Sequence, residues 1–248
     1  MLAVVIDAMK ILILGASSKV GSALAHAFAP KNELILVGRN LERLAIAAAL
    51  CEEAGAAELR SVDLDFGVGI ERLLQVIAGQ QIDLVIDAAS ASSNKRDTEI
   101  GIEEVGPLIA ADFTSRIKLF EYLSRTQDSQ PAVIFISTVL TLVKSPGRVV
   151  YTALKGLAET YLRKLCESRP ESHLLIVYVG TVIDPKGDTG KPTKLAVAVA
   201  EAFRRKRTRL LYGLSGRFLL GLFYLQPVVF DLFTKVQRKI RGLFTRPA

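Results

Sequence analysis

The sequence predicts an α/β protein in which one doubly wound parallel sheet of six or seven strands carries helices on both faces. Short apolar runs alternate with helical patterns, and this order favours parallel strands joined by right-handed crossovers. The run Ile11–Leu14 is apolar without alternation, as in a central strand that is covered on both faces. A chain of 248 residues, 50% of them hydrophobic, is long enough for one such domain.

Turn-forming and capping residues separate the expected elements. Gly15 follows the first strand, Pro30 ends the first helix, and Asn40 is a candidate N-cap of the second helix. The expected strands are residues 11–14, 33–37, 57–62, 82–90 including the exit, 131–137 and 174–179, with a short seventh candidate at 210–212. The expected helices are residues 20–28, 41–54, 70–78, about 107–126 and 151–168.

The basic charge is concentrated at the end of the chain. Residues 1–212 would form the α/β domain, and residues 213–248 a helical extension that is apolar and basic. The net charge is +7, and Glu201–Ala248 contains 11 Lys or Arg against 2 acidic residues. No nucleic-acid recognition motif accompanies this charge, so a nucleic-acid partner is not expected.

The extension suits a membrane surface better than a membrane span. Its apolar run, Phe218–Phe233, is shorter than the roughly 20 residues that cross a bilayer, and polar residues and a proline interrupt it. Basic flanks around an aromatic-rich amphipathic segment are typical of a helix lying on an anionic membrane. A subunit interface or a substrate lid is an equally good interpretation of the same pattern.

The cysteines and the N-terminus suit a reduced, cytoplasmic protein. Cys51 and Cys166 lie far apart in helix-like contexts, so both are expected as small core residues rather than as a disulfide. The apolar N-terminus lacks a basic leader, so a signal peptide is not predicted. His26 and His173 have no other ligand type at metal-binding spacing, so no metal site is predicted. A peripheral location at the inner face of a membrane remains open because of the extension.

A nucleotide site is predicted where the first strand ends. Gly15 would let the backbone turn sharply, and Gly21 would let the next helix approach both the sheet and a bound pyrophosphate. Free N–H groups at the start of that helix suit an anion, so a nucleotide is the first ligand to expect, bound to a doubly wound sheet of the Rossmann type. The candidate cofactor-binding residues of this loop are Gly15, Ser17, Ser18, Lys19, Val20 and Gly21.

The end of the second strand favours NADP(H) over NAD(H). Dinucleotide sites commonly carry an acidic residue there for the ribose 2′-hydroxyl, whereas this strand ends in Gly38-Arg39-Asn40. Arg39 could pair with a 2′-phosphate instead. The alternative is that Arg39 is only a solvated loop residue.

A tyrosine and a lysine form the second chemical constellation. Tyr151 and Lys155 are four residues apart near the start of a helix, so they share one helical face. A neighbouring cation would lower the tyrosine pKa and allow proton transfer near neutral pH. A hydroxyl from Ser137 or Thr138, at the end of the preceding strand, could hold a substrate carbonyl oxygen. The pair follows the fifth strand, at the edge where such sheets bind ligands.

Together these residues resemble the classical short-chain dehydrogenase/reductase family, collinearly over roughly residues 10–184. The resemblance implies that Tyr151 is the general acid/base and that Lys155 lowers its pKa and binds the nicotinamide ribose. It implies that Thr138 orients the substrate oxygen, since its separation from the tyrosine is the usual one; a one-residue loop change would favour Ser137. Further cofactor contacts implied by the resemblance are Asp63, Leu64, Ala88, Ala89, Gly180 and Val182.

Several positions depart from the family pattern. Lys19 stands in place of the second loop glycine, and Val179 in place of a proline. Asp87-Ala88 stands where the family has two asparagines. Asp112 occupies the position of an asparagine in the proton relay, which leaves that relay open. The departures indicate a divergent member, and a catalytically degenerate nucleotide-binding or regulatory protein is the alternative.

The chain is also similar to reductases of keto-ribose carried on decaprenyl phosphate, whose cofactor loop likewise lacks the second glycine and whose tail is apolar and basic. This resemblance implies an oxidoreductase that transfers hydride between NADP(H) and a small-molecule or lipid-linked carbonyl or secondary alcohol. It also implies peripheral contact with an anionic membrane. Dimers or tetramers are common in the broader family, so a homo-oligomer is expected.

Overall fold

A seven-stranded parallel sheet forms the centre of the computed structural model, which describes residues 8–90, 99–142, 147–169, 171–180 and 190–213. The strand order is β3-β2-β1-β4-β5-β6-β7, and every neighbouring pair is parallel. The predicted doubly wound sheet is therefore confirmed, including its seventh strand. The strands are β1 (Lys10–Leu14), β2 (Glu33–Gly38), β3 (Glu58–Asp63), β4 (Leu84–Asp87), β5 (Ala132–Thr138), β6 (Leu174–Val179) and β7 (Arg209–Tyr212).

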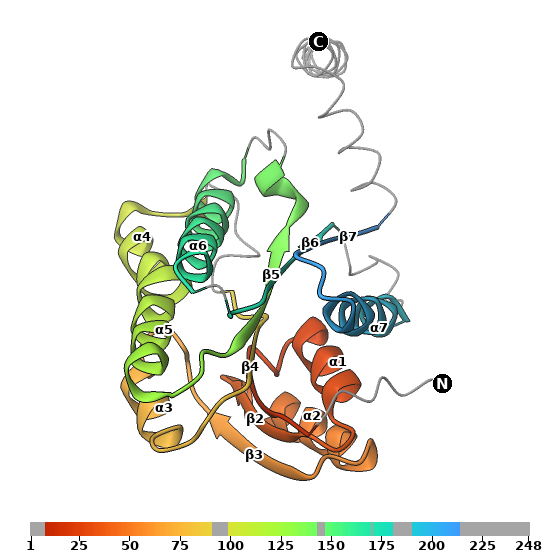
Figure 1. Cartoon of the computed structure of the whole chain (residues 1–248). Helices are drawn as coiled ribbons and strands as arrows, with labels where there is room; N and C mark the ends of the chain where they lie inside the picture. Colours follow the sequence, from red (N-terminus) through yellow and green to blue (C-terminus); the bar gives the residue numbers. More distant parts are fainter. Residues whose placement is uncertain (1–7, 91–98, 143–146, 170, 181–189, 214–248) are drawn as a thin grey trace.

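Helices cover both faces of the sheet (Figure 1). One face carries α1 (Lys19–Phe28), α2 (Leu41–Glu53) and α7 (Gly190–Arg204). The other carries α3 (Ile70–Val76), α4 (Ile102–Ile109), α5 (Ser115–Thr126) and α6 (Val149–Glu167). The chain reverses its direction of travel across the sheet between β1 and β4, and ligands of such folds bind at the carboxyl edge near that point.

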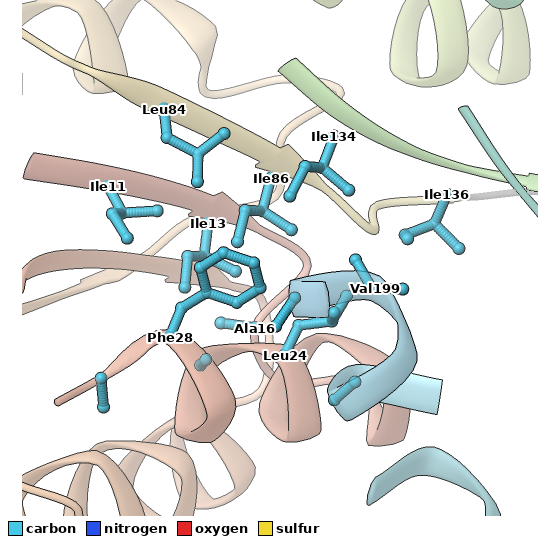
Figure 2. Close-up of a cluster of buried hydrophobic side chains, with 14 of the residues drawn as sticks. Ile11, Ile13, Ala16, Leu24, Phe28, Leu84, Ile86, Ile134, Ile136 and Val199 are labelled. Atoms are coloured by element: carbon cyan, nitrogen blue, oxygen red, sulfur yellow. The ribbon is translucent and has the colours of Figure 1, made fainter. Parts of the chain in front are cut away.

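Two apolar layers hold the helices against the sheet. In the layer shown in Figure 2, Ile13 of β1 and Ile86 of β4 lie near Phe28 of α1, and Val199 of α7 lies beside the same layer. All four side chains are at most 1% exposed. Burial on both faces explains why the sequences of the inner strands β1, β2, β4, β5 and β6 are continuously apolar instead of alternating.

Helix α7 is not among the expected elements, although its sequence carries a helical signal. Leu195, Ala196, Val199 and Ala200 recur at three- and four-residue spacing, and all are at most 1% exposed. The helix packs chiefly on α1. Pro192 lies in its first turn, where the missing N–H of proline costs no hydrogen bond.

The long helix expected from about Pro107 begins earlier and is not uniform, which corrects that prediction. Helix α4 starts at Ile102 and contains Pro107 in its interior. A π-helical turn, Ala110–Thr114, then connects α4 to α5. The widened turn presents carbonyl groups of Ala111 and Asp112 to the side chain of Arg116. Sequence periodicity does not distinguish this turn from an α-helix because the apolar pattern runs through it.

Close approaches at glycine explain the shape of the first loop. Gly15 has a φ of 78°, and a Cβ atom there would lie 2.8 Å from the backbone nitrogen of Ala89. A Cβ atom at Gly21 would overlap the carbonyl oxygen of Gly15. The two glycines therefore let β1, α1 and the segment after β4 meet.

The cysteines are free thiols, as expected: Cys51 is buried in the core, and Cys166 is half-buried. No helix in the described ranges combines the length and the apolar character needed to cross a membrane. The extension predicted at residues 213–248 lies outside the described residues, apart from Gly213.

Candidate active site

The carboxyl ends of the strands gather the predicted site residues at one edge of the sheet. The residues after β1, β2 and β3 form the half of the site that we propose to bind the cofactor. The residues after β4, β5 and β6 form the half that we propose to carry out the reaction. The predicted residues in the described ranges are Gly15, Ser17, Ser18, Lys19, Val20, Gly21, Arg39, Asp63, Leu64, Ala88, Ala89, Asp112, Ser137, Thr138, Tyr151, Lys155 and Gly180. Val182 lies outside them.

The first loop is closed by hydrogen bonds of its own. Ser18 is the N-cap of α1, and its hydroxyl accepts a hydrogen bond from the N–H of Gly21 at 2.9 Å. Ser17 packs on Gly38, where a Cβ atom would lie 2.6 Å from the serine oxygen. Lys19 begins the helix and is exposed. The loop thus combines a helix N-terminus, an exposed cation and glycines that have no side chain to block a ligand. These features fit the phosphates of a dinucleotide.

Arg39 follows β2 and reaches outward. Its side chain is 64% exposed, and its Nη1 atom lies 3.7 Å from Oδ2 of Asp65. Such an exposed ion pair contributes at most about 1 kcal/mol, so Arg39 can exchange it for another anion. Asp63 ends β3, and the N–H of Leu64 donates to the carbonyl of Gly38 at 2.9 Å, which holds this strand end beside Arg39.

The hydroxyls of Ser137 and Thr138 have different partners. Thr138 forms a hydrogen bond with Tyr151, whereas Ser137 donates to Oε1 of Glu159. Glu159 is 6% exposed and also accepts from Thr141 at 3.0 Å and from Tyr178 at 2.9 Å. Ser137 is thus held within a buried network, and Thr138 is the hydroxyl that meets the tyrosine.

Burial raises the pKa of Tyr151 above its ordinary value of 10.0, while the hydrogen bond with Thr138 opposes that rise. We expected Lys155 to lower the pKa of Tyr151, but the net shift in the structure is upward and Lys155 is not among its causes. In the absence of a cofactor the phenol is protonated at neutral pH, because transfer of a phenolate into the protein interior is costly. The side chain therefore carries the proton that the reduction of a carbonyl group requires.

Lys155 is buried and bound to the backbone. Its ammonium donates to the carbonyl of Ile136 at 3.0 Å and to that of Ala89 at 3.2 Å, and it lies 4.9 Å from the ring centre of Phe135. Burial, and next the charge of Arg116, lower the pKa of Lys155 from 10.5 to about 8. The unfolded chain keeps this proton up to a higher pH than the folded protein does. The neutral form of Lys155 therefore favours folding fully above pH 10.5, and this contribution to stability is lost as the pH falls toward 8.

A buried arginine that the sequence analysis does not select lies beside this lysine. The side chain of Arg116 is 1% exposed, and that of Asp87 is 0% exposed. Nε and Nη2 of Arg116 donate to the two carboxylate oxygens of Asp87 at 2.6 and 3.0 Å, which is a bidentate ion pair. Nη2 also donates to the carbonyl of Ala89 at 2.7 Å, and Nη1 to that of Asp112.

The sequence holds a signal for this arginine. A carboxylate at the end of a central apolar strand, such as Asp87, needs a counter-charge inside the protein. Asp112 and Arg116 are four residues apart, a spacing that places opposite charges together on a helix, and their side chains lie 3.7 Å apart. Glu159 carries a comparable signal, since it follows Lys155 by one further turn of the same helix.

The short chain dehydrogenase family model matches residues 9–182. The chain belongs to the short-chain dehydrogenase family. The members of this family are oxidoreductases with a Rossmann-type fold, and they use a nicotinamide cofactor. The predicted family, fold and class of cofactor are therefore confirmed. No curated protein sequence matches the chain.

Solved structures agree with the family at the level of the fold. A short-chain dehydrogenase from Streptomyces avermitilis is 21% identical, with a TM-score of 0.74, over 96% of this chain and 99% of its own. A 7β-hydroxysteroid dehydrogenase is 23% identical, with a TM-score of 0.73, over 86% and 90% of the two chains. L-Sorbose reductase from Gluconobacter frateurii, solved with NADPH and L-sorbose, is 17% identical, with a TM-score of 0.70, over 85% and 97%.

Proposed function

We propose that this short-chain dehydrogenase is an NADP(H)-dependent reductase in which Tyr151 transfers the proton. The observation that carries the proposal is the contact of Tyr151 with Thr138 beside the buried Lys155, at the carboxyl edge of the sheet. A bound NADPH supplies the hydride. The two glycines of the first loop, the N-terminus of α1 and exposed Arg39 provide the features that its phosphates and 2′-phosphate require.

Each side chain has one task in this mechanism. Thr138 donates a hydrogen bond that orients the substrate carbonyl oxygen, and Tyr151 gives its hydroxyl proton to that oxygen as it gains negative charge. In the oxidation direction Tyr151 takes the proton back. Lys155 donates two hydrogen bonds to backbone carbonyls, which fix its position. Its third N–H group then serves as a donor for the nicotinamide ribose. The relay through Asp112 is not part of the proposal, because Asp112 is engaged with Arg116.

Replacement of Tyr151 by Phe tests the assigned proton transfer. We expect Tyr151→Phe to bind NADPH as wild type does and to lose about 10²- to 10⁴-fold in turnover, the usual contribution of a positioned acid or base. Fluorescence titration of NADPH and a rate assay on soluble ketones and lipid-linked keto-sugars measure the two effects. Ser137→Ala is the matched hydroxyl control, with a smaller loss of turnover. Equal loss of binding and turnover in Tyr151→Phe would contradict the role.

The wild-type protein separates the proposal from its alternative. A catalytically degenerate nucleotide-binding protein is the second reading, and the replacements at Lys19, Asp87 and Asp112 motivate it. Saturable NADPH binding without turnover on the whole panel of carbonyl substrates would favour that reading. Turnover on any one of them rules it out.

Arg39 tests the cofactor preference. Because its only described ion-pair partner is the exposed Asp65, it is free to accept a 2′-phosphate. We expect Arg39→Ala to weaken NADPH binding about tenfold, or by about 1.4 kcal/mol, and to leave NADH binding nearly unchanged. Arg43→Ala serves as the control for loss of surface charge, because Arg43 is an exposed arginine in the first turn of α2. Stronger binding of NADH than of NADPH by wild type would contradict the proposal.

We further propose that the substrate is carried on a lipid and that residues 213–248 contact an anionic membrane. The apolar and basic composition of that segment supports this proposal. Sedimentation with anionic vesicles should remove wild type from solution at low salt, with less binding to neutral vesicles. A variant that lacks residues 218–248 should stay in the supernatant. No binding, or binding that survives the deletion, would rule out the membrane role.

A homo-oligomer is proposed as well. Ile102 on α4 and Val149 on α6 are 84% and 62% exposed, and such side chains are often buried by association. Light scattering of the purified protein should give at least twice the mass of one chain, and a monomer would contradict this.

A further inference from the structure

Arg116 connects three segments that meet at the candidate active site. Its guanidinium pairs with Asp87 at the end of β4 and donates to the carbonyl of Ala89 just beyond that strand. The same group donates to the carbonyls of Ala111 and Asp112 in the π-helical turn. One buried side chain thus fixes the distance between β4 and the turn that leads into α5.

The segment held by Arg116 touches both halves of the site. The N–H of Ala89 donates to Oδ1 of Asp87 at 3.1 Å, and its carbonyl accepts from Arg116 at 2.7 Å and from Lys155 at 3.2 Å. Gly15 of the first loop packs against the same backbone. A shift of the Ala89 peptide would therefore move an anchor of Lys155 and a contact of the first loop together.

We propose that Arg116 is a positioning residue of the reaction: it holds the Ala88–Ala89 backbone where that backbone meets the cofactor and anchors Lys155. This inference rests on the proposed function, since it assigns Arg116 a part in the same site. Asp87 and Asp112 stand where the family has asparagines, and this proposal explains both aspartates. A carboxylate holds a guanidinium by charge as well as by hydrogen bonds, whereas an amide offers hydrogen bonds alone.

The charges around Lys155 determine which variants are informative. Arg116 and Lys155 face the carboxylates of Asp87 and Asp112, and Glu159 approaches Lys155 from its own helix. Removal of Arg116 alone would leave Asp87 buried without its partner and would destabilise the fold for that reason only. Arg116→Lys keeps the charge but cannot form the bidentate pair. Arg116→Met combined with Asp87→Asn removes the pair and keeps the net charge of the cluster, and Asp112 then loses the guanidinium as well.

The test compares these two variants with a charge control on the same helix. Lys118→Met removes an exposed lysine of α5, whose partner is Glu71 at 2.5 Å. For each variant the thermal midpoint, the NADPH dissociation constant, and kcat and KM for the best carbonyl substrate are measured. We expect kcat to fall about 10-fold in Arg116→Lys and about 100-fold in the double variant, with substrate KM within about 3-fold of wild type, because misplacement of about 1 Å has costs of this order.

NADPH binding should weaken in the same order, and Lys118→Met should match wild type. A folded double variant with wild-type kcat and NADPH affinity would overturn the proposal and reduce Arg116 to a structural ion pair. Failure of both variants to fold would overturn it as well, since Arg116 would then serve the fold alone. If wild type binds NADPH but turns over no substrate, the proposed function fails, while the NADPH affinities still decide whether Arg116 holds the Ala89 segment.

Discussion

The buried pair of Asp87 and Arg116 is the interaction on which the candidate site depends. A carboxylate that is 0% exposed at the end of a central strand is tolerated only with a counter-charge, because an unpaired buried ion costs several kcal/mol. Arg116 supplies that charge from the first turn of α5 and donates to the carbonyl of Ala89 as well. The position of the backbone after β4 therefore follows from the pair, and the anchor of Lys155 follows from that backbone.

The order of the strands explains how the rest of the site is assembled. The ends of β1, β2 and β3 bring together a helix N-terminus, two close-packed glycines and an exposed arginine, which are the features of a dinucleotide site. The ends of β4 and β5, with α6, bring together the lysine, the tyrosine and Thr138. The two sets meet where Gly15 packs against the Ala88–Ala89 backbone. Hydride and proton chemistry can thus share one edge of the sheet.

Sequence alone predicts what local pattern encodes and fails where tertiary contacts decide. Continuous apolar runs predict the inner strands because both faces of the sheet are covered there, whereas the edge strands β3 and β7 are partly polar and exposed. The spacing of Tyr151 and Lys155 predicts that both share one helix, and both lie on α6. The choice between Ser137 and Thr138 needed the structure, since it depends on Glu159 drawing Ser137 into a buried network. The raised pKa of Tyr151 depends on burial, which no local pattern reports. The spacing of Asp112 and Arg116 indicates an ion pair on a helix, but the burial of Asp87 shows that Arg116 is also its partner.

The central claim is that Tyr151 is the proton-transfer group of a cofactor-dependent reductase, and its ionisation tests that claim most directly. Phenolate absorbance of wild type minus that of Tyr151→Phe, followed against pH, isolates this tyrosine from the others. Without cofactor the account predicts a pKa above the ordinary value of 10.0, because the phenol is buried. With saturating NADP⁺ it predicts a lower pKa, because the bound nicotinamide adds positive charge beside the phenol. A Tyr151 titration that saturating NADP⁺ leaves unchanged would contradict the account.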